Sequence, residues 1–316
     1  MIGVFCTCFT RRIKRTRPFF LLSFKLAVLI LVSIGIANAD SSVPDPFANE
    51  NSAQPSSGVT HYFRSLVDNQ KEQAQALVEV ASGRNLLTFG AIGITTLVLI
   101  SQDDRIDRSM RNLQEGRAWI YNDADRVTGL GGYYGIAGVI GFGTYGFLSS
   151  DLKAQETTLL TSQALITSGL WTQLLKVAAG RKRPGAEYDV THTASTTWSP
   201  FEMLVPDKHA AGSSFNSFPS GHTTVAFSIA TVVAEQYADK PAVPVIAYAT
   251  AGLVGISRML LHAHWASDVF LGGAIGYACA EQIVSRHRRS DKQAWNVAIT
   301  PYPGNAAGMV TVQFNW

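Results

Sequence analysis

The stretch from Ser257 to Asp268, SRMLLHAHWASD, places an arginine, a histidine and an aspartate within a short apolar segment. His264 and Asp268 are four positions apart, so on a helix they lie on one face. A carboxylate that holds one imidazole nitrogen fixes the ring tautomer and leaves the other nitrogen nucleophilic. Arg258 adds a planar guanidinium that suits phosphate oxygens. Taken alone, the stretch fits phosphate chemistry and an apolar helix with a stray His–Asp pair equally well.

Two further blocks with suitable chemistry lie upstream. Lys176 to Pro184 reads KVAAGRKRP and falls at the C-terminal end of an apolar segment, where basic residues also serve as ordinary helix caps. Pro219 to His222 reads PSGH and opens the next apolar segment, where a serine is a common N-cap. The three blocks follow one another, each at the boundary of an apolar helix. That combination favours one shared anion site over three unrelated helix ends.

This triple pattern resembles the signature of the type-2 phosphatidic-acid phosphatase and vanadium haloperoxidase superfamily. The signature reads Lys-x6-Arg-Pro, then Pro-Ser-Gly-His, then Ser-Arg-x5-His-x3-Asp. Every signature position is present here, as Lys176, Arg183, Pro184, Pro219, Ser220, Gly221, His222, Ser257, Arg258, His264 and Asp268. The resemblance covers about residues 85–290. It implies an all-α fold with a six-helix bundle core.

The resemblance also implies a role for each signature residue. His264 is the expected nucleophile, Asp268 orients it, and His222 protonates the leaving oxygen and later activates water. The expected phosphate-binding residues are Lys176, Arg183, Ser220, Gly221 and Arg258. These basic side chains and backbone N–H groups would neutralise the phosphoryl charge. We therefore expect neither a metal ion nor another cofactor.

The apolar segments that must position these residues have helical length and many small residues. They lie at about 85–101, 129–148, 158–179, 221–237, 243–257 and 268–284. Glycines recur in the second and the last, for example Gly272, Gly273 and Gly276, and such residues permit close helix contact. A thin apolar stripe over 61–82 predicts a short peripheral helix. These patterns predict an all-α core.

A densely charged stretch over 101–126 separates the first two apolar segments. Its aspartates Asp103, Asp104, Asp107, Asp123 and Asp125 suggest a metal site, but arginines are interleaved with them. Alternating charges of this kind favour a solvated, self-paired loop or helix.

Composition excludes several classes of protein. The chain has 316 residues with 47% hydrophobic and 16% charged residues, and its formal net charge of +3 is too small to indicate nucleic acid as a partner. Cysteine occurs only at Cys6, Cys8 and Cys279. One cysteine in the body of the chain excludes an internal disulfide there and a cysteine-based metal cluster.

Four regions follow from these patterns. Residues 1–39 carry a basic stretch, an apolar run and Ala-Asn-Ala, which predicts an export signal, with an uncleaved anchor helix as the alternative. Residues 40–84 read as a linker and the peripheral helix, and 85–290 as the phosphatase domain. Residues 291–316 alternate around PYPGNAAG, which predicts a short C-terminal β-hairpin.

The expected substrates are phosphate esters or pyrophosphates of membrane lipids, such as phosphatidate, phosphatidylglycerol phosphate, polyprenyl pyrophosphate or lipid A. A soluble periplasmic acid phosphatase of broad specificity is the first alternative, and a vanadate-dependent haloperoxidase is the second. A non-catalytic anion-binding module is disfavoured because both histidines and the aspartate are present. The oligomeric state is left open by the sequence.

The expected location is the inner membrane or the periplasm, with the site facing the periplasm. If all six segments spanned the membrane after an exported signal, the site would face the cytoplasm. A periplasmic site therefore requires that one weak segment does not span, or that the bundle only lies on the membrane.

In the 185–218 loop, Tyr188, His192, Trp198 and His209 are candidates for the pocket entrance. We expect a structural role for His262, while Trp198 and Trp265 fit either a pocket wall or core packing.

Overall fold

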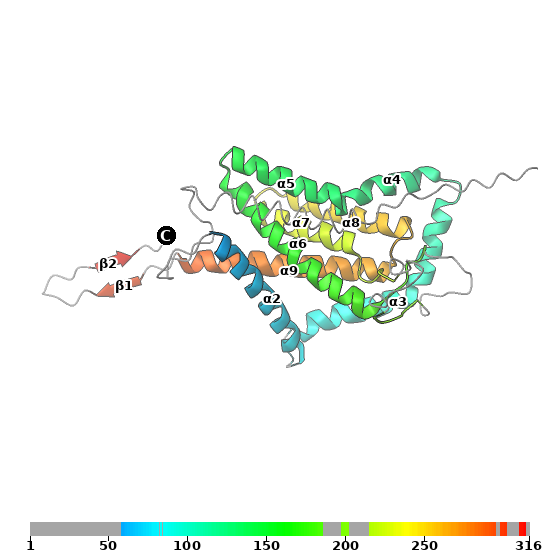
Figure 1. The fold of residues 1–316 in the computed structure, drawn as a ribbon, viewed down its shortest axis with the longest axis horizontal. Coiled ribbons are helices and arrows are strands. Elements are labelled where there is room, and N and C mark those ends of the chain that lie inside the picture. Colours follow the sequence, from blue (N-terminus) through cyan, green and yellow to red (C-terminus); the bar gives the residue numbers. More distant parts are fainter. Residues whose placement is uncertain are drawn as a thin grey trace, which may run out of the picture.

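The computed structural model describes residues 58–81, 83, 85–185, 197–201, 215–294, 298–301 and 310–313. The predicted export signal and most of the predicted linker lie outside these residues. The described part is mainly helical, which agrees with the predicted all-α class. Figure 1 shows the long helices of the bundle running side by side.

Each predicted apolar segment lies in a helix, but α3 and α9 continue ten or more residues beyond the predicted ends at 101 and 284, and α6 begins six residues before 158. Two of the helices were not among the six segments: α2, which is the predicted peripheral helix, and α4, which lies in the charged stretch. The helical elements are α2 (Gly58–Ala81), α3 (Leu86–Gln114), α4 (Ala118–Thr128), the 3-10 helix η2 (Gly129–Gly131), α5 (Tyr133–Leu148), α6 (Leu152–Ala179), α7 (Gly221–Gln236), α8 (Ala242–Leu260) and α9 (Ala266–Ala294).

Helix α7 lies at the centre of the bundle and packs against α6, α8 and α9. One apolar cluster joins α6, α7 and α9 through residues that include Leu160, Val232 and Ile283. A second cluster joins α7 to α8 through Ala226, Ala230, Ala251 and Val254. Since α7 carries His222 in its first turn, burial of α7 on three sides fixes this histidine relative to the neighbouring helices.

Glycines of α9 allow α9 to approach α7 closely. A Cβ at Gly272 would lie 2.5 Å from the Ser220 carbonyl oxygen, and one at Gly276 would lie 2.4 Å from that of Thr224. Real Cβ atoms do not come this close to backbone, so any larger residue would push the helices apart. The predicted close contact at these two glycines is therefore present, and it brings the start of α9 against the start of α7.

Helix α3 has two halves of opposite character, and its second half corrects the sequence analysis. The charged residues from 101 onward continue the helix and pass across the end of the bundle where α8 ends and α9 begins (Figure 1). Asp103 is 1% exposed and bonds Arg181 and Ser267. The predicted solvated, self-paired stretch is wrong for Asp103, because its partner lies far away in the sequence.

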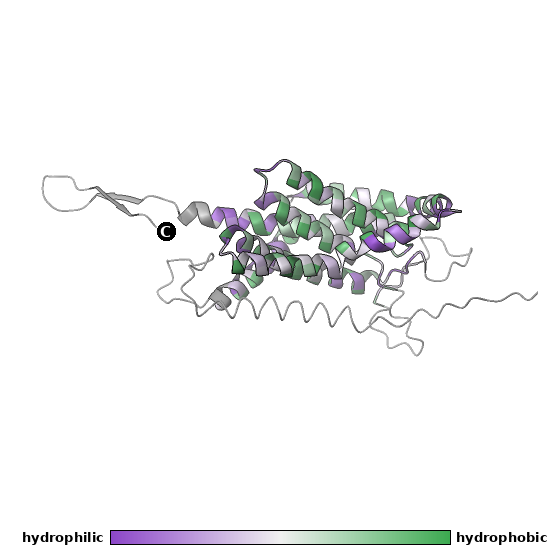
Figure 2. Ribbon diagram, turned by 90° about the horizontal axis from the view of Figure 1, so that it is seen from above, coloured by the Kyte–Doolittle hydropathy of each residue, from purple (hydrophilic) through white to green (hydrophobic). Residues whose placement is uncertain are grey.

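Many large apolar side chains on the outside of the bundle are exposed. They include Leu87, Ile94 and Leu97 of α3, Leu148 of α5 and Val245 of α8. By length and hydropathy α3 and α8 could each cross a membrane. In Figure 2 hydrophobic residues extend along the long helices of the bundle, and hydrophilic ones gather toward their ends.

The C-terminal region contains two short strands, β1 (Ala298–Pro301) and β2 (Val310–Gln313). They pair in antiparallel fashion, with Ala298 opposite Gln313 and Pro301 opposite Val310. The residues that connect them lie outside the described part of the chain.

Candidate active site

The last turn of α6 and the segment after it bring basic residues to one end of the bundle. Lys176 lies in the last turn of α6, and Gly180 ends the helix with a φ of 52°. A Cβ at Gly180 would lie 1.7 Å from the Ser199 carbonyl oxygen, so only glycine fits this turn. Lys176 Nζ then donates to the Asn216 carbonyl oxygen at 2.5 Å, and Arg183 Nε donates to the Asn216 side-chain oxygen at 2.9 Å. Asn216 thus holds two of the predicted phosphate ligands.

The PSGH block forms the entry to α7. Ser220 is the N-cap residue, but its side chain makes no capping bond and its hydroxyl accepts from Thr223 at 2.9 Å. Its backbone N–H donates to the Asp268 carbonyl oxygen at 2.9 Å. The expected use of the Ser220 N–H for phosphate therefore conflicts with the structure, because that donor already has a partner.

His222 lies against the glycine-rich turn η2. A Cβ at Gly132 would lie 3.1 Å from His222 Nε2, and one at Gly131 would lie 2.5 Å from the His222 carbonyl oxygen. The absence of side chains at these two positions lets the turn pass close to the ring. The stretch from η2 into α5 is therefore one wall of the site on the His222 side.

Arg258 reaches the site from the last turn of α8 and is 7% exposed. Its Nη1 donates to Thr128 Oγ1 at 2.8 Å, at the end of α4. Its buried Nε–H has no hydrogen-bond partner among the described residues. A buried guanidinium donor without a partner is costly, and an anion in the site would satisfy it.

His264 is held by a backbone oxygen. It lies in the turn between α8 and α9, and its Nδ1 is 2.7 Å from the carbonyl oxygen of Ser217. A carbonyl oxygen can only accept, so Nδ1 carries the proton and Nε2 keeps its lone pair. This tautomer presents Nε2 as a nucleophile.

Asp268 does not bond His264 as directly as the sequence predicted. His264 precedes α9, so the two residues do not share a helical face, and Nδ1 of His264 is 3.6 Å from the nearer carboxylate oxygen. That oxygen accepts the Ser217 hydroxyl at 2.5 Å and the Trp265 N–H at 2.9 Å. Asp268 therefore acts on the ring mainly through Ser217 and the turn.

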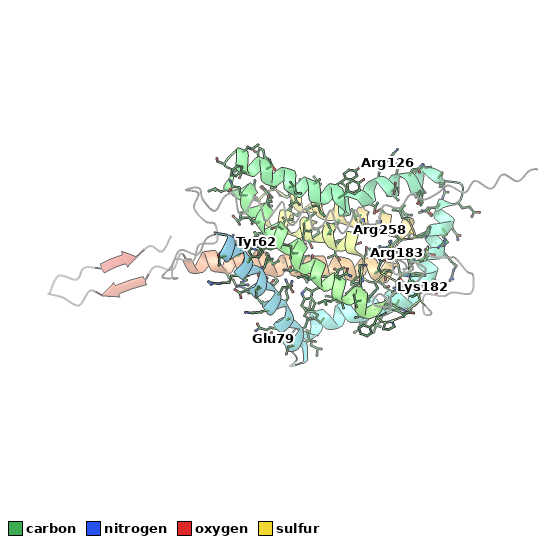
Figure 3. All side chains as sticks on the ribbon, in the orientation of Figure 1. Tyr62, Glu79, Arg126, Lys182, Arg183 and Arg258 are labelled. Atoms are coloured by element: carbon green, nitrogen blue, oxygen red, sulfur yellow. The ribbon has the colours of Figure 1, made fainter. Side chains whose placement is uncertain are left out.

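Burial and positive charge both act on the two histidines. Burial is the larger cause that lowers the pKa of His264 well below 6.5, followed by the nearby charges of Arg183, Arg258 and Lys176. The pKa of His222 is lowered by burial and then chiefly by Arg258. Figure 3 shows the side chains of Arg183 and Arg258 at the same end of the bundle. Burial and the neighbouring cations therefore both favour the neutral form of each ring.

Three residues that sequence reasoning missed complete the surroundings of His264: Asp103, Arg181 and Ser217. Arg181 lies two positions before Arg183 in a run of basic residues, and nothing in that run marks Arg181 as the buried one. Asp103 was assigned to a solvated stretch. Ser217 holds His264 through its carbonyl oxygen, which every residue type possesses, and its hydroxyl bonds Asp268, 51 positions away, so no local sequence signal identified it.

The remaining predicted residues are placed as follows. His262 bonds Asp107 at 2.8 Å and Gln114 at 2.9 Å, which is a structural role as expected. Trp265 is buried and its indole N–H donates to the Lys182 carbonyl oxygen. The other entrance candidates, Tyr188, His192 and His209, lie outside the described residues. Among the described residues no group of three His, Cys, Asp or Glu side chains could hold a metal ion.

Comparison with known proteins points to one family. Residues 157–291 match the model of the PAP2 superfamily. A stretch of 82 residues is 44% identical to a lipid A 1-phosphatase from Porphyromonas gingivalis, covering 26% of this chain and 18% of that protein. A stretch of 112 residues is 36% identical to a lipid A 1-phosphatase from Rhizobium etli, covering 35% of this chain and 42% of that protein. This chain thus spans less than half the length of either relative.

A solved structure was also matched. It is the transmembrane PAP2 type phosphatidylglycerolphosphate phosphatase from Bacillus subtilis, with a TM-score of 0.44 and 20% identity over 63% of this chain and 95% of that one. The matched residues 157–291 contain the complete three-block signature, from Lys176 to Asp268. The resemblance seen in the sequence is confirmed over this part of the chain: residues 157–291 are similar to the PAP2 superfamily.

Proposed function

We propose that this chain is a metal-independent phosphatase that hydrolyses phosphate monoesters or pyrophosphates of membrane lipids through a phosphohistidine at His264. The observation that carries the proposal is the 2.7 Å bond from Nδ1 to the Ser217 carbonyl oxygen, which leaves Nε2 free to attack. Lys176, Arg183 and Arg258 supply positive charge around it. Relatives named lipid A phosphatases support a lipid phosphate as the substrate.

In the first step, Nε2 of His264 forms a bond to phosphorus while the bond from phosphorus to the leaving oxygen breaks. The leaving oxygen takes a proton from His222. His222 is neutral in the empty site, so we propose that the arriving phosphate raises its proton affinity and supplies or stabilises that proton. Lys176, Arg183 and Arg258 balance the charge on the three equatorial phosphoryl oxygens.

In the second step, His222 takes a proton from water, and the water oxygen attacks phosphorus. The bond from phosphorus to Nε2 breaks, inorganic phosphate leaves, and His264 returns to its starting tautomer. The Nδ1–H stays on the Ser217 carbonyl oxygen throughout, which keeps the ring in one orientation. Each turnover consumes one water and releases one alcohol or phosphate leaving group.

Exposed apolar side chains support a membrane setting over the soluble acid phosphatase. Leu87 is 90% exposed, Leu97 67% and Val245 69%, and these residues lie on the two helices that could cross a membrane. Water is a poor solvent for so many large apolar groups, whereas lipid tails are a good one. A lipid-bound bundle also brings the site to the surface where lipid head groups lie.

A substrate panel tests the proposal. Initial rates of phosphate release are measured on phosphatidate, phosphatidylglycerol phosphate, polyprenyl pyrophosphate, lipid A and p-nitrophenyl phosphate, with His264→Ala as the blank. We expect the highest kcat/KM on one of the lipids. Preference for p-nitrophenyl phosphate would favour the soluble acid phosphatase, and halide oxidation with added vanadate would favour the haloperoxidase.

We further propose that the site faces the periplasm. Arg126 and Lys240 mark the two ends of the bundle: α4 ends beside Arg258, while the turn from α7 to α8 lies at the opposite end. Both residues are exposed. In a chain with Cys6→Ser and Cys8→Ser, a membrane-impermeant maleimide added to intact bacteria should label Arg126→Cys. Labelling of Lys240→Cys alone would place the site in the cytoplasm.

A further inference from the structure

Arg181 holds two aspartates from opposite parts of the chain. Its Nη2 donates to Asp103 at 2.8 Å, and its Nη1 donates to Asp268 at 2.6 Å and to Ser267 at 2.7 Å. Ser267 also donates its hydroxyl and its N–H to Asp103. All three ionised side chains are fully buried. We name Asp103, Arg181 and Asp268 the arginine clamp.

Aromatic rings fix the guanidinium of Arg181 in its plane. The centroid of the Trp198 ring lies 4.4 Å from the guanidinium carbon, and that of Trp265 lies 5.1 Å away. Phe218 contacts the Trp198 ring edge to face. Cation–π contacts of this kind strengthen where water is excluded. The guanidinium therefore has little freedom to turn away from either carboxylate.

Fold stability alone is a poor explanation for this clamp. Burying three charged groups is costly, and well-packed apolar residues in the place of a buried ion pair often leave a protein equally stable or more so. The contacts of the clamp lead instead to the reacting histidine. Asp268 accepts the Ser217 hydroxyl, and the Ser217 carbonyl oxygen accepts Nδ1–H of His264. A continuous series of short bonds thus connects α3 to the nucleophile.

We infer that Asp103 and Arg181 are positioning residues for His264, which they hold through Asp268 and Ser217 so that Nε2 faces the phosphate. The inference rests on the function proposed above. Arg181 fixes the Asp268 carboxylate in place, and Asp103 restores the negative charge that Arg181 would otherwise cancel. The clamp keeps a net charge of −1 beside the ring, where positive charge develops as Nε2 attacks. The charged half of α3 is thereby part of the catalytic apparatus.

The first test compares Asp103→Asn with Asp123→Asn, which removes the same charge from an exposed ion pair on α4. We expect Asp103→Asn to lower kcat by roughly 10- to 100-fold, the scale of a slightly misplaced reacting group. KM and competitive inhibition by inorganic phosphate should stay near the wild-type values, because Lys176, Arg183 and Arg258 are unchanged. Asp123→Asn should behave as wild type.

The second test is chemical rescue of Arg181→Ala. Removal of this side chain leaves a slot between Trp198 and Trp265 that fits a guanidinium ion. Guanidinium at millimolar concentration should restore kcat of Arg181→Ala several-fold and have no such effect on Asp123→Asn. If Arg181→Ala does not fold, the kcat of Asp103→Asn decides whether the inference holds. A folded Arg181→Ala enzyme that guanidinium does not rescue would overturn the inference.

A third readout is independent of activity. Nitrogen-15 NMR of the histidine rings reports the tautomer of His264, which we expect to be the Nδ1–H form in the wild type and a mixture of both forms in Asp103→Asn. If Asp103→Asn had the ring spectrum of the wild type, or a kcat equal to that of the wild type, the inferred positioning role of the clamp would be overturned. A wild-type chain that releases phosphate from no substrate would instead refute the proposed function, and the tautomer would still test the clamp.

Discussion

The two halves of α3 invert the usual relation between residue type and burial. In the first half, Leu87, Ile94 and Leu97 are apolar and exposed. In the second half, Asp103 is charged and fully buried. The first half contacts the surroundings of the protein, while the second half bonds the loop after α6 and the turn that carries His264.

The difference shows which environment each half of α3 requires. Exposed leucines on a long helix are stable if the surrounding medium is lipid, and a buried aspartate is stable if it is paired and fully hydrogen-bonded. Neither half follows the rule for water-soluble proteins, in which apolar residues are buried and charged residues are exposed. One helix therefore connects the proposed membrane region to the proposed catalytic region.

The largest expected effect is a difference in kcat between variants of two histidines that lie in the same turn. His264→Ala should lower kcat by about 10⁴-fold or more, because it removes the attacking atom. His262→Asn should keep kcat within about tenfold, since His262 only ties the turn to Asp107 and Gln114 of α3. Asparagine is the matched choice because His262 has a φ of 48°, which asparagine tolerates.

The measurement is the steady-state rate of phosphate release, with thermal unfolding of each variant as the control for folding. If His262→Asn lost as much activity as His264→Ala while remaining folded, His262 would itself take part in the reaction. The structural role assigned to His262 would then be wrong.

A charge placed in each half of α3 tests the contrast itself. Leu97→Asp should destabilise the membrane-inserted chain by about 2.5–3.5 kcal/mol, the cost of an aspartate among lipid tails. Ser109→Asp, an exposed position in the charged half, should stay within about 0.5 kcal/mol of the wild type. The readouts are resistance to extraction by alkaline carbonate and thermal unfolding in lipid nanodiscs. Equal behaviour of the two variants would mean that both halves contact water.

The smallest expected effect is on the pH profile. Burial and the neighbouring cations lower the pKa of His264 well below 6.5, so its nucleophilic form persists as the pH falls. An ordinary histidine would be about 97% protonated at pH 5. We therefore expect kcat/KM, which reports the free enzyme, to fall by less than about tenfold between pH 7 and pH 5. A loss of about 30-fold over this range would show that the His264 pKa is ordinary.

The sequence predicted the helices well because their signal is local. Each apolar segment has helical length, and the boundaries of α7 and α8 lie within a few residues of the predicted ones. Prediction of burial from the sequence failed where the same residue type occurs both in the interior and at the surface. Asp103 and Asp123 look alike within a run of alternating charges, yet one is buried against Arg181 and the other pairs with Arg126 at the surface.

The sequence by itself determined which side chains the proposed site contains: two histidines, three basic residues and a carboxylate at set spacings around helix ends. These residues can be recognised in the sequence because the proposed reaction requires particular side chains. Only the tertiary structure decided what holds the proposed nucleophile, His264. Asp103 lies 78 positions from Arg181, and the Ser217 carbonyl oxygen lies 47 positions from His264. Contacts this distant depend on how the helix ends meet, and a backbone oxygen leaves no mark in the sequence.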